Sequence, residues 1–303
     1  MGMNDSGKVD LVMVACVARE VTMIVQPAIF YRVSRVHILN YVLNKKRNEA
    51  EVKRAKIYED VRDEVCRRLR AEDIEVVLHD SRPTYRFNEM MREVFGILSE
   101  ERDRHSTVFV NISGGTSEYA AAAAIASNMF DNTQLFNVGA KNSVESADEL
   151  RASITKNGMI IGSTDEVLDP YSIEGFRIEP PDPKLLEALS VFAKIPIEKR
   201  TNTRVVHELI ERGIWKGLDE NSSRWVRIKG TSLEILDEIN GRPTNNDLYH
   251  RRRNSENVRY QKMFIDKWKA KGWIEQDNRY GSRKYDLTKE GRMHLQIFRN
   301  EDV

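Results

Sequence analysis

Cysteine is scarce in this chain, since only Cys16 and Cys66 occur among 303 residues. Cys16 lies in an apolar strand pattern and Cys66 in a helix pattern, and neither belongs to a Cys-x-x-Cys pair, so we interpret both as reduced thiols. Long apolar runs are missing as well, because no segment is apolar over the length that a bilayer requires. These absences exclude a disulfide scaffold and predict a cytoplasmic protein with no membrane partner.

The motifs of common nucleotide enzymes are also absent. The chain contains neither Gly-x-x-x-x-Gly-Lys-Ser/Thr nor Gly-x-Gly-x-x-Gly, which argues against Walker-type phosphate binding and against NAD or FAD. Ser113 lies in no nucleophile-elbow pattern and has no evident base. We therefore expect no cofactor, no metal site and no catalytic residue. The six histidines are scattered without metal-ligand spacing, at His37, His79, His105, His207, His250 and His294.

Strand-length and helix-length patterns alternate through the first half of the chain. The spacing predicts strands over 9–17, 36–42, 74–78, 108–112 and 133–138, with another strand or a hairpin over 159–162. Helices are predicted between them, over 20–32, 51–71, 86–99 and 120–126. The alternation predicts an α/β fold, namely a Rossmann-like parallel sheet with helices on both faces.

The most informative stretch is 107–119, Thr-Val-Phe-Val-Asn-Ile-Ser-Gly-Gly-Thr-Ser-Glu-Tyr. An apolar strand leads into the turn Ser113-Gly114-Gly115-Thr116, and an alanine-rich helix follows. The first amides of such a helix have no partner within it, and together with the helix dipole they favour an anion. Glycine lets a ligand approach the backbone, and the Ser113 and Thr116 hydroxyls add donors. The turn therefore predicts a phosphate or anion site, although a buried helix packed on the sheet would also explain the alanines.

Parallel sheets bind ligands at the carboxyl ends of their strands, where the strand order reverses. In this chain the loops at those ends are 15–20, 79–86, 113–117 and 139–142. They offer three cations and one stacking face to an anionic ligand that carries a base, on Arg19, Arg82, Lys141 and Tyr85. Each of these could equally be a solvated loop side chain.

A proline cluster at Pro180, Pro181 and Pro183 marks the best domain boundary, because proline continues neither a helix nor a central strand. We predict a ligand-sensing domain over 1–180. Residues 181–230 form either a helical linker or a degenerate winged-helix unit, and spacing alone does not decide between the two. The remaining residues, 231–303, form a third segment.

The third segment is basic. Residues 242–292 hold 14 Lys and Arg against 7 Asp and Glu, although the whole chain has a net charge of only +1. Its pattern predicts a helix over 232–239, a helix start at Thr244, a longer helix to Lys271, two strands around 277–282 and a last helix after Thr288. Local positive charge favours DNA over a docked protein as the partner, although winged helices serve both purposes.

This order of elements, with the run Lys-Gly-Trp-Ile…Arg-Lys-Tyr-Asp-Leu-Thr-Lys-Glu-Gly, resembles a winged helix-turn-helix. In that family the N-terminal residues of one helix contact bases in the major groove, and the wing contacts the backbone or a minor groove. The resemblance places the expected contacts to double-stranded DNA at Arg251, Arg252, Arg253, Ser255, Asn257, Arg259, Tyr260, Arg279, Arg283 and Lys284.

The pattern strand–Asn-x-Ser-Gly-Gly-Thr–helix, on an alternating α/β domain joined to a winged helix, resembles the CRISPR-associated Rossmann-fold (CARF) family and its archaeal winged-helix transcriptional regulators. The resemblance implies a homodimer whose sensor domains bind a cyclic oligoadenylate made in antiviral defence. It implies that Ser113–Thr116 carry the ligand-binding turn and that Ala18 and Arg19 form a second wall. Many family members have lysine where this chain has Ser117, and Lys141 or Arg19 would then supply the charge.

We therefore expect a cytoplasmic, ligand-gated DNA-binding transcriptional regulator. Two alternatives stay open. One is a ring nuclease that cleaves the cyclic ligand by using the ligand's own 2′-hydroxyl, with the protein only orienting groups and stabilising charge. The other is a plain DNA-binding regulator whose sensor domain is vestigial.

Overall fold

The computed structural model divides the chain into two compact units, Met1–Pro180 and Pro181–Val303, and each is described here by itself. Pro180 and Pro181 of the proline cluster lie on either side of this division. The residues that the structure describes are 9–40, 49–141, 155–156, 159–160, 164, 166–175, 177–215, 227–229, 232–234, 257–277, 279, 284–299 and 301.

The first unit is built on a six-stranded sheet with the order β3-β2-β1-β4-β5-β8. The first five strands pair in parallel, and β8 pairs antiparallel with β5. The sheet is Rossmann-like, and the predicted α/β class is confirmed. The strands are β1 (Leu11–Val17), β2 (Arg35–Asn40), β3 (Glu75–His79), β4 (Thr107–Asn111), β5 (Thr133–Asn137) and β8 (Tyr171–Ser172).

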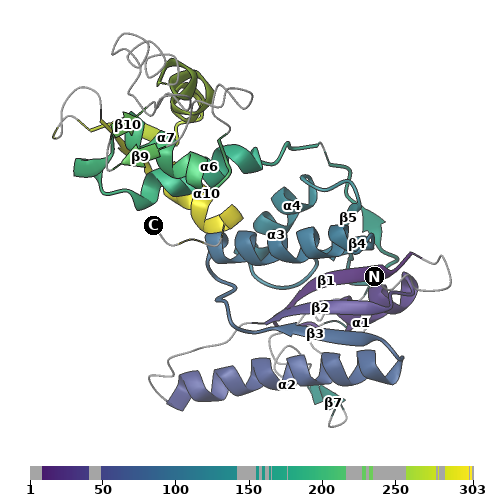
Figure 1. Cartoon of the computed structure of the whole chain (residues 1–303). Helices are drawn as coiled ribbons and strands as arrows, with labels where there is room; N and C mark the ends of the chain where they lie inside the picture. The colour runs from purple at the N-terminus through teal and green to yellow at the C-terminus, as the bar shows by residue number, and fades with distance from the viewer. Residues whose placement is uncertain are drawn as a thin grey trace. The chain divides into compact units, whose positions relative to one another are not determined.

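Helices cover both faces of this sheet, with α1 and α2 on one face and α3 and α4 on the other (Figure 1). A strand covered on both faces buries every side chain, which is why β1 is almost continuously apolar. Its residues from Val12 to Val17 are all buried, and Met13, Ala15 and Val17 belong to the core under α1 and α2. The helices are α1 (Thr22–Phe30), α2 (Glu49–Ala71), α3 (Phe87–Asp103) and α4 (Ser117–Ser127).

The end of the first unit agrees with the prediction at one hairpin and differs from it at one strand. The segment expected to be a sixth strand or a hairpin over 159–162 is the second arm of a hairpin, in which β6 (Thr155–Lys156) pairs antiparallel with β7 (Met159–Ile160). The sixth strand of the main sheet is β8, which the sequence did not indicate. Two residues are too few to show the alternation by which a strand is recognised.

The second unit begins with α6 (Pro183–Lys194), which starts where the sequence places its signals. The Asp182 carboxylate accepts hydrogen bonds from the amides of Lys184 and Leu185, and Pro183 occupies the first helical position. The other elements are η1 (Ile197–Lys199), α7 (Asn202–Glu211), β9 (Arg227–Lys229), β10 (Ser232–Glu234), η2 (Gln261–Ile265), α9 (Asp266–Ala270), β11 (Ile274–Gln276), β12 (Tyr285–Leu287) and α10 (Lys289–Arg299).

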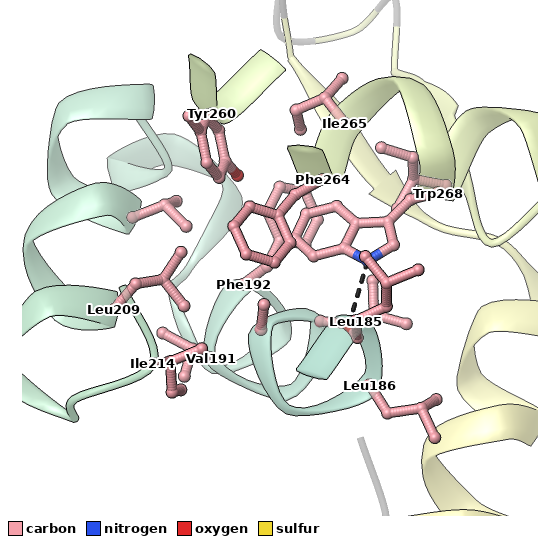
Figure 2. Packing of buried hydrophobic residues seen from close by; sticks show 14 of the residues in the cluster. Leu185, Leu186, Val191, Phe192, Leu209, Ile214, Tyr260, Phe264, Ile265 and Trp268 are labelled. Carbon is pink, nitrogen blue, oxygen red and sulfur yellow. Dashed lines mark hydrogen bonds between the residues drawn. The ribbon is translucent and has the colours of Figure 1, made fainter. Parts of the chain in front are cut away.

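One apolar core joins the middle and C-terminal segments of this unit (Figure 2). Phe192 of α6 packs near Trp268, whose indole N–H donates to the carbonyl of Leu185 at 3.1 Å. Arg200 lies over the Phe192 ring at 4.3 Å and donates to the carbonyl of Tyr285 at 2.9 Å. The described helices between residues 183 and 211 therefore share a core with the residues that follow them.

The predicted wing region is a β-hairpin. Strands β11 and β12 pair antiparallel, with Ile274 opposite Leu287. Thr288 caps α10 by accepting from the amide of Gly291, and its hydroxyl donates to the carbonyl of Gly272. A Cβ at Gly291 would overlap the carbonyl of Trp273, so only glycine lets α10 approach β11 this closely.

Two helical elements were predicted in the segment before this hairpin. The predicted helix over 232–239 is wrong where it can be compared, because Ser232–Glu234 is a strand paired with β9. The predicted helix start at Thr244 lies outside the described residues. The helix that follows is described from residue 257 and contains a π-helical turn over Gln261–Ile265.

Candidate anion-binding site

The strand order of the first unit reverses between β1 and β4, because β2 and β3 extend to one side of β1 and β5 lies beyond β4. Connections from two adjacent parallel strands then leave in opposite directions and open a crevice at the carboxyl ends. Residues 18–21 follow β1 and residues 112–116 follow β4, so these two loops border the crevice. The glycine turn singled out in the sequence therefore lies at the switch point.

The turn packs directly onto the end of β1. Gly115 has φ +91°, and a Cβ there would be 2.6 Å from Cβ of Cys16, while a Cβ at Gly114 would be 3.2 Å from the Cys16 carbonyl oxygen. Both the backbone conformation and the space therefore require glycine at position 115. Burial raises the pKa of the Cys16 thiol to about 12, against the opposing effect of the Thr116 backbone N–H, so Cys16 is a neutral packing group.

Asn111 and Ser113 fix the first half of the turn. The Asn111 side chain accepts from the amide of Ser113 at 2.9 Å and donates to the carbonyl of Met23 in α1 at 2.8 Å. The Ser113 hydroxyl oxygen accepts from the amide of Val138, just beyond β5, at 2.7 Å. In the described part of the chain the Ser113 hydroxyl donates to no acceptor, so its proton is available to a ligand.

Thr116 fixes the second half of the turn and starts α4. Its hydroxyl oxygen accepts from the amide of Tyr119 at 3.1 Å, which is a helix N-cap, and its proton goes to the carbonyl of Thr84 at 2.6 Å. Thr84 lies in the loop after β3, so this bond joins two loops of the same sheet edge. Because its only proton is already donated, Thr116 cannot act as the hydroxyl donor to a ligand that the sequence suggested.

Some backbone amides at this turn have no partner in the described part of the chain. Within the described residues, no hydrogen bond satisfies the N–H groups of Gly114, Gly115, Ser117 and Glu118. Ser117 is exposed at the first position of α4, where the helix dipole favours negative charge. Glu118 opposes an anion here, because its carboxylate stands in the same first turn and accepts from the Ser117 hydroxyl at 3.2 Å.

The three cations predicted to face the ligand differ in their pairing. Arg82 is held by two carboxylates, at 2.9 Å from Glu89 and 2.6 Å from Glu93. Lys141 forms an exposed ion pair with Glu166 at 2.7 Å. Arg19 is exposed and donates to the Tyr58 hydroxyl of α2 at 3.4 Å, with no ion-pair partner among the described residues. Arg19 therefore carries the charge that is least compensated.

The other predicted ligand contacts lie on the loops where the sequence placed them. Ala18 is half-buried directly after β1. Tyr85 is 48% exposed in the loop after β3, and the Arg86 guanidinium lies 5.9 Å from the centre of its ring. An exposed tyrosine on a loop of this edge has an aromatic face that can stack on a flat ligand group.

Sequence reasoning missed the residues that hold the turn in place. The turn is contacted from β4, from the loop after β3 and from β1, by Asn111, Thr84 and Cys16. The hydroxyl of the buried Tyr119 also donates a hydrogen bond to the carbonyl of Asn111 at 2.9 Å. One signal was available: an asparagine two residues before a serine commonly bonds that residue's amide. The contribution of Thr84 depends on tertiary structure and leaves no trace in local spacing.

The predicted DNA contacts fall partly outside the described residues, namely Arg251, Arg252, Arg253, Ser255 and Arg283. Asn257 is half-buried. Arg259 lies over the Trp215 ring at 4.9 Å, and the exposed Arg279 donates to Asp277 at 2.7 Å.

Two predicted contacts are used inside the second unit. Tyr260 is completely buried in its core, so the prediction that it contacts DNA is wrong. Lys284 donates to the carbonyls of Ile197 and Glu198, at 2.8 and 2.6 Å, and so joins the wing to η1.

The described part of the chain has neither a metal-binding cluster nor a membrane-spanning helix. None of its groups of three or more His, Cys, Asp or Glu residues has an arrangement that could hold a metal ion. None of its helices combines the length and apolar character that crossing a membrane requires.

Comparisons with known proteins match the first unit. The family described as HFX_2341_N:-like, N-terminal, matches residues 11–143. A comparison with curated proteins found no match. The matched residues contain the first five strands of the sheet and both loops that border the crevice.

Solved structures give distant likenesses. Can2 from Sulfobacillus thermosulfidooxidans, in complex with cyclic tetra-adenylate, is 18% identical over 42% of this chain and 31% of its own, with a TM-score of 0.29. Csm6 from Enterococcus italicus, bound to cyclic hexa-2′-fluoro-hexa-dAMP, is 9% identical over 68% of this chain and 50% of its own, with a TM-score of 0.34. A type III CRISPR defence DNA nuclease activated by cyclic oligoadenylate is 14% identical over 70% of this chain and 32% of its own, with a TM-score of 0.35. This chain thus spans a half or less of each of these three proteins.

Proposed function

We propose that this protein is a sensor of a cyclic oligoadenylate, or of a related anionic nucleotide, and that ligand binding controls a DNA-binding C-terminal unit. In this proposal the first unit is a CARF domain, two copies of which form one composite pocket. The protein acts as a transcriptional regulator in CRISPR-linked antiviral defence.

The observation that carries the sensor proposal is the set of unused donors at the switch point. Four backbone amides and the Ser113 hydroxyl proton lie in one turn, at the start of an 11-residue helix, without a partner in the described residues. Such donors bind phosphate oxygens by the same physics as the phosphate loops of nucleotide-binding folds. Arg19 on the facing loop supplies positive charge, and Tyr85 supplies a stacking face for a base.

The ligand class follows from the resemblance of residues 111–116 to the CARF turn. The described contacts fit a ligand held mainly through its backbone phosphates, since the turn offers N–H groups and one hydroxyl rather than a carboxylate that would bind a sugar. The serine at position 117 replaces a lysine that many family members carry. We expect Arg19 to provide part of the missing attraction.

The DNA-binding part of the proposal is supported by the basic C-terminal segment and by its hairpin. The hairpin β11–β12 and the capped helix α10 occur where the winged-helix resemblance predicts them. Ligand binding would favour one relative placement of two winged helices in a dimer and so change the affinity for DNA half-sites.

Incubation of the purified protein with labelled cyclic tetra-adenylate and cyclic hexa-adenylate tests the sensor proposal. Retention of intact ligand supports it, and the absence of retention with either ring contradicts it. Linear products would instead indicate the ring-nuclease alternative. Ser117→Lys provides a matched variant, because it restores a cation next to the unused amides and should tighten binding.

A further inference from the structure

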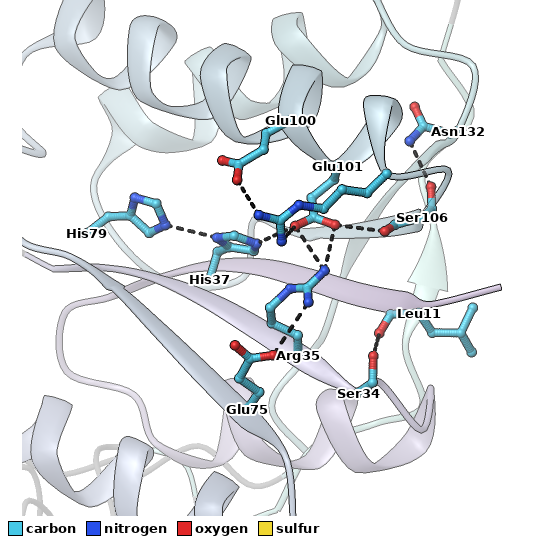
Figure 3. Close-up of polar contacts among 11 residues, drawn as sticks. Leu11, Ser34, Arg35, His37, Glu75, His79, Glu100, Glu101, Ser106 and Asn132 are labelled. Carbon is cyan, nitrogen blue, oxygen red and sulfur yellow. Dashed lines mark hydrogen bonds and ion pairs between the residues drawn. The ribbon is translucent and has the colours of Figure 1, made fainter. Parts of the chain in front are cut away.

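A chain of buried polar side chains crosses the α3 face of the sheet in the first unit (Figure 3). His37 of β2 and His79 of β3 stand at its centre, with His37 Nδ1 and His79 Nε2 only 2.9 Å apart. Each ring is held at its other nitrogen by a carboxylate of α3. His37 Nε2 lies 3.1 Å from Glu101, and His79 Nδ1 lies 2.7 Å from Glu93.

Both carboxylates are ionised. Burial would raise the pKa of Glu101, but hydrogen bonds from His37, Ser106 and Arg35 outweigh it and lower the pKa to about 2. The hydrogen bond from His79 likewise lowers the pKa of Glu93 against burial, and Arg82 adds to the effect. An ionised carboxylate only accepts, so each histidine must present an N–H to its carboxylate.

Two neutral histidines cannot satisfy this arrangement. A neutral imidazole carries one N–H, and in each ring the carboxylate requires that N–H at the outer nitrogen. The inner nitrogens would then both be bare, and two lone pairs would face each other at 2.9 Å. A neutral ring turned to its other tautomer would instead place its lone pair against a carboxylate. Two fully protonated rings fail as well, because two N–H groups would then meet.

We propose that His37 and His79 share one additional proton, so that the pair holds three ring protons and a single positive charge. The shared proton forms the hydrogen bond between the two inner nitrogens. Without the shared proton, or with a second one, two like groups would face each other at 2.9 Å, and the hydrogen bond between the His37 and His79 side chains would be lost. The pair is therefore a proton-dependent hydrogen bond that joins the side chains of β2 and β3 at the edge of the sheet.

Without this proton, the charged groups around the pair carry one negative charge in excess, since four carboxylates face three arginines. The Arg35 guanidinium binds Glu101 through both oxygens, at 2.8 and 3.0 Å, and also approaches Glu75 at 3.4 Å. Arg104 reaches Glu101 at 3.4 Å. On the other side Arg82 binds Glu93 and Glu89. Each carboxylate that holds a histidine thus has its own arginine, and the pair's charge lies between two such ion pairs.

The hydrogen bond between His37 and His79 lies next to a loop of the candidate anion site. His79 is the last residue of β3, and the loop that it starts carries Arg82 and Thr84. Thr84 accepts the hydroxyl proton of Thr116 at the glycine turn. When the histidine pair separates, this loop keeps the Arg82 ion pairs and the Thr84–Thr116 bond but loses the contact that holds its first residue.

Nuclear magnetic resonance of the full chain, labelled with ¹⁵N at histidine, tests the proposal directly. At pH values of about 6 to 8, we expect about three protons on the four ring nitrogens of the pair, because hydrogen-bond matching requires that number. A count of two or of four, or two histidines with independent titrations, would overturn it. This measurement needs no variant and does not depend on the ligand.

Proton release on unfolding gives a second readout, from calorimetry in two buffers of different ionisation enthalpy. At pH 8 the unfolded histidines are neutral, so unfolding of the natural chain should release about one proton more than unfolding of His79→Gln, by proton linkage. His207→Gln is the matched control, because His207 pairs with Glu211 within the second unit, and it should release the same number of protons as the natural chain. Equal release from all three proteins would contradict the shared proton.

Discussion

Gly115 of the turn lies against Cys16 of β1 so closely that a single added carbon would overlap it. A Cβ at Gly115 would be 2.6 Å from Cys16 Cβ and 2.8 Å from its sulfur, and Gly115 also has φ +91°. The loop after β4 is thereby pressed onto the neighbouring strand. This contact sets the direction of the unused amides that follow it.

Gly115→Ala should destabilise the first unit by about 1–3 kcal/mol, because it adds both backbone strain and overlap with Cys16. Chemical denaturation followed by circular dichroism measures the change. Gly96→Ala is the control: Gly96 lies within α3, and a Cβ there meets nothing within 4 Å. That variant should gain up to about 1 kcal/mol from helix propensity. Equal stabilities of the two variants would contradict the close packing at Gly115.

Thr116 offers a test of the link between the turn and the loop after β3. Thr116→Val keeps the shape but removes both the N-cap bond to Tyr119 and the bond to the Thr84 carbonyl, which should cost about 1–3 kcal/mol. Thr116→Ser retains the hydroxyl and should stay within about 0.5 kcal/mol of the natural chain. Hydrogen exchange should show faster exchange at the start of α4 in the valine variant only. Unaltered exchange there would argue against the cap.

The sequence was sufficient for the parallel sheet because each central strand is an apolar run bounded by polar residues, as in Leu11–Val17. It was insufficient where contacts depend on distant elements. The bond from Thr116 to Thr84 and the pairing of His37 with His79 join residues 32 and 42 positions apart. No local period predicts such contacts.

The helix that follows residue 257 shows a second kind of limit. A regular helical period places Val258 on the same side as the buried Ile265, yet Val258 is 55% exposed, and Tyr260, expected to contact DNA, is buried. The π-helical turn over Gln261–Ile265 explains the difference. A π turn inserts one residue relative to an α-helix and rotates the faces before and after it. A regular helical period therefore assigns the wrong face to residues before the turn.

Charge at the mouth of α4 should control anion affinity. Glu118→Gln removes a carboxylate beside the unused amides and should strengthen binding of cyclic oligoadenylate, whereas Arg19→Gln should weaken it by about tenfold, the effect of roughly 1.4 kcal/mol. Lys141→Gln should have a smaller effect than Arg19→Gln, since Glu166 already balances Lys141. Isothermal titration at two salt concentrations measures all three. Affinities that do not change with either Glu118 or Arg19 would place the ligand elsewhere.

The buried Glu101 predicts acid sensitivity of the first unit. Its pKa of about 2 lies below the ordinary 4.5, so the carboxylate stabilises the fold above pH 4.5, and this stabilisation is lost as the pH falls toward 2. Glu101→Gln removes the charge and leaves Arg35 and the histidine pair without their acceptor, which should cost about 3 kcal/mol or more at pH 7. Denaturation between pH 7 and 3 should show a smaller pH dependence in the variant. An identical dependence would mean that Glu101 is not the group that titrates.

Arg279 and Lys284 lie close together in the wing but should behave differently. Lys284 donates to the carbonyls of Ile197 and Glu198, so Lys284→Ala should lower the stability of the second unit by about 1 kcal/mol, through the loss of two hydrogen bonds, one of them half-buried. Arg279 is exposed and pairs with Asp277, and exposed ion pairs contribute little to stability, so Arg279→Ala should change stability less than Lys284→Ala while weakening DNA binding. Thermal unfolding and fluorescence anisotropy with duplex DNA separate the two effects. The salt dependence of binding should also be smaller for Arg279→Ala, by about one counterion. DNA affinity and salt dependence that match the natural chain would remove the wing from the proposed interface.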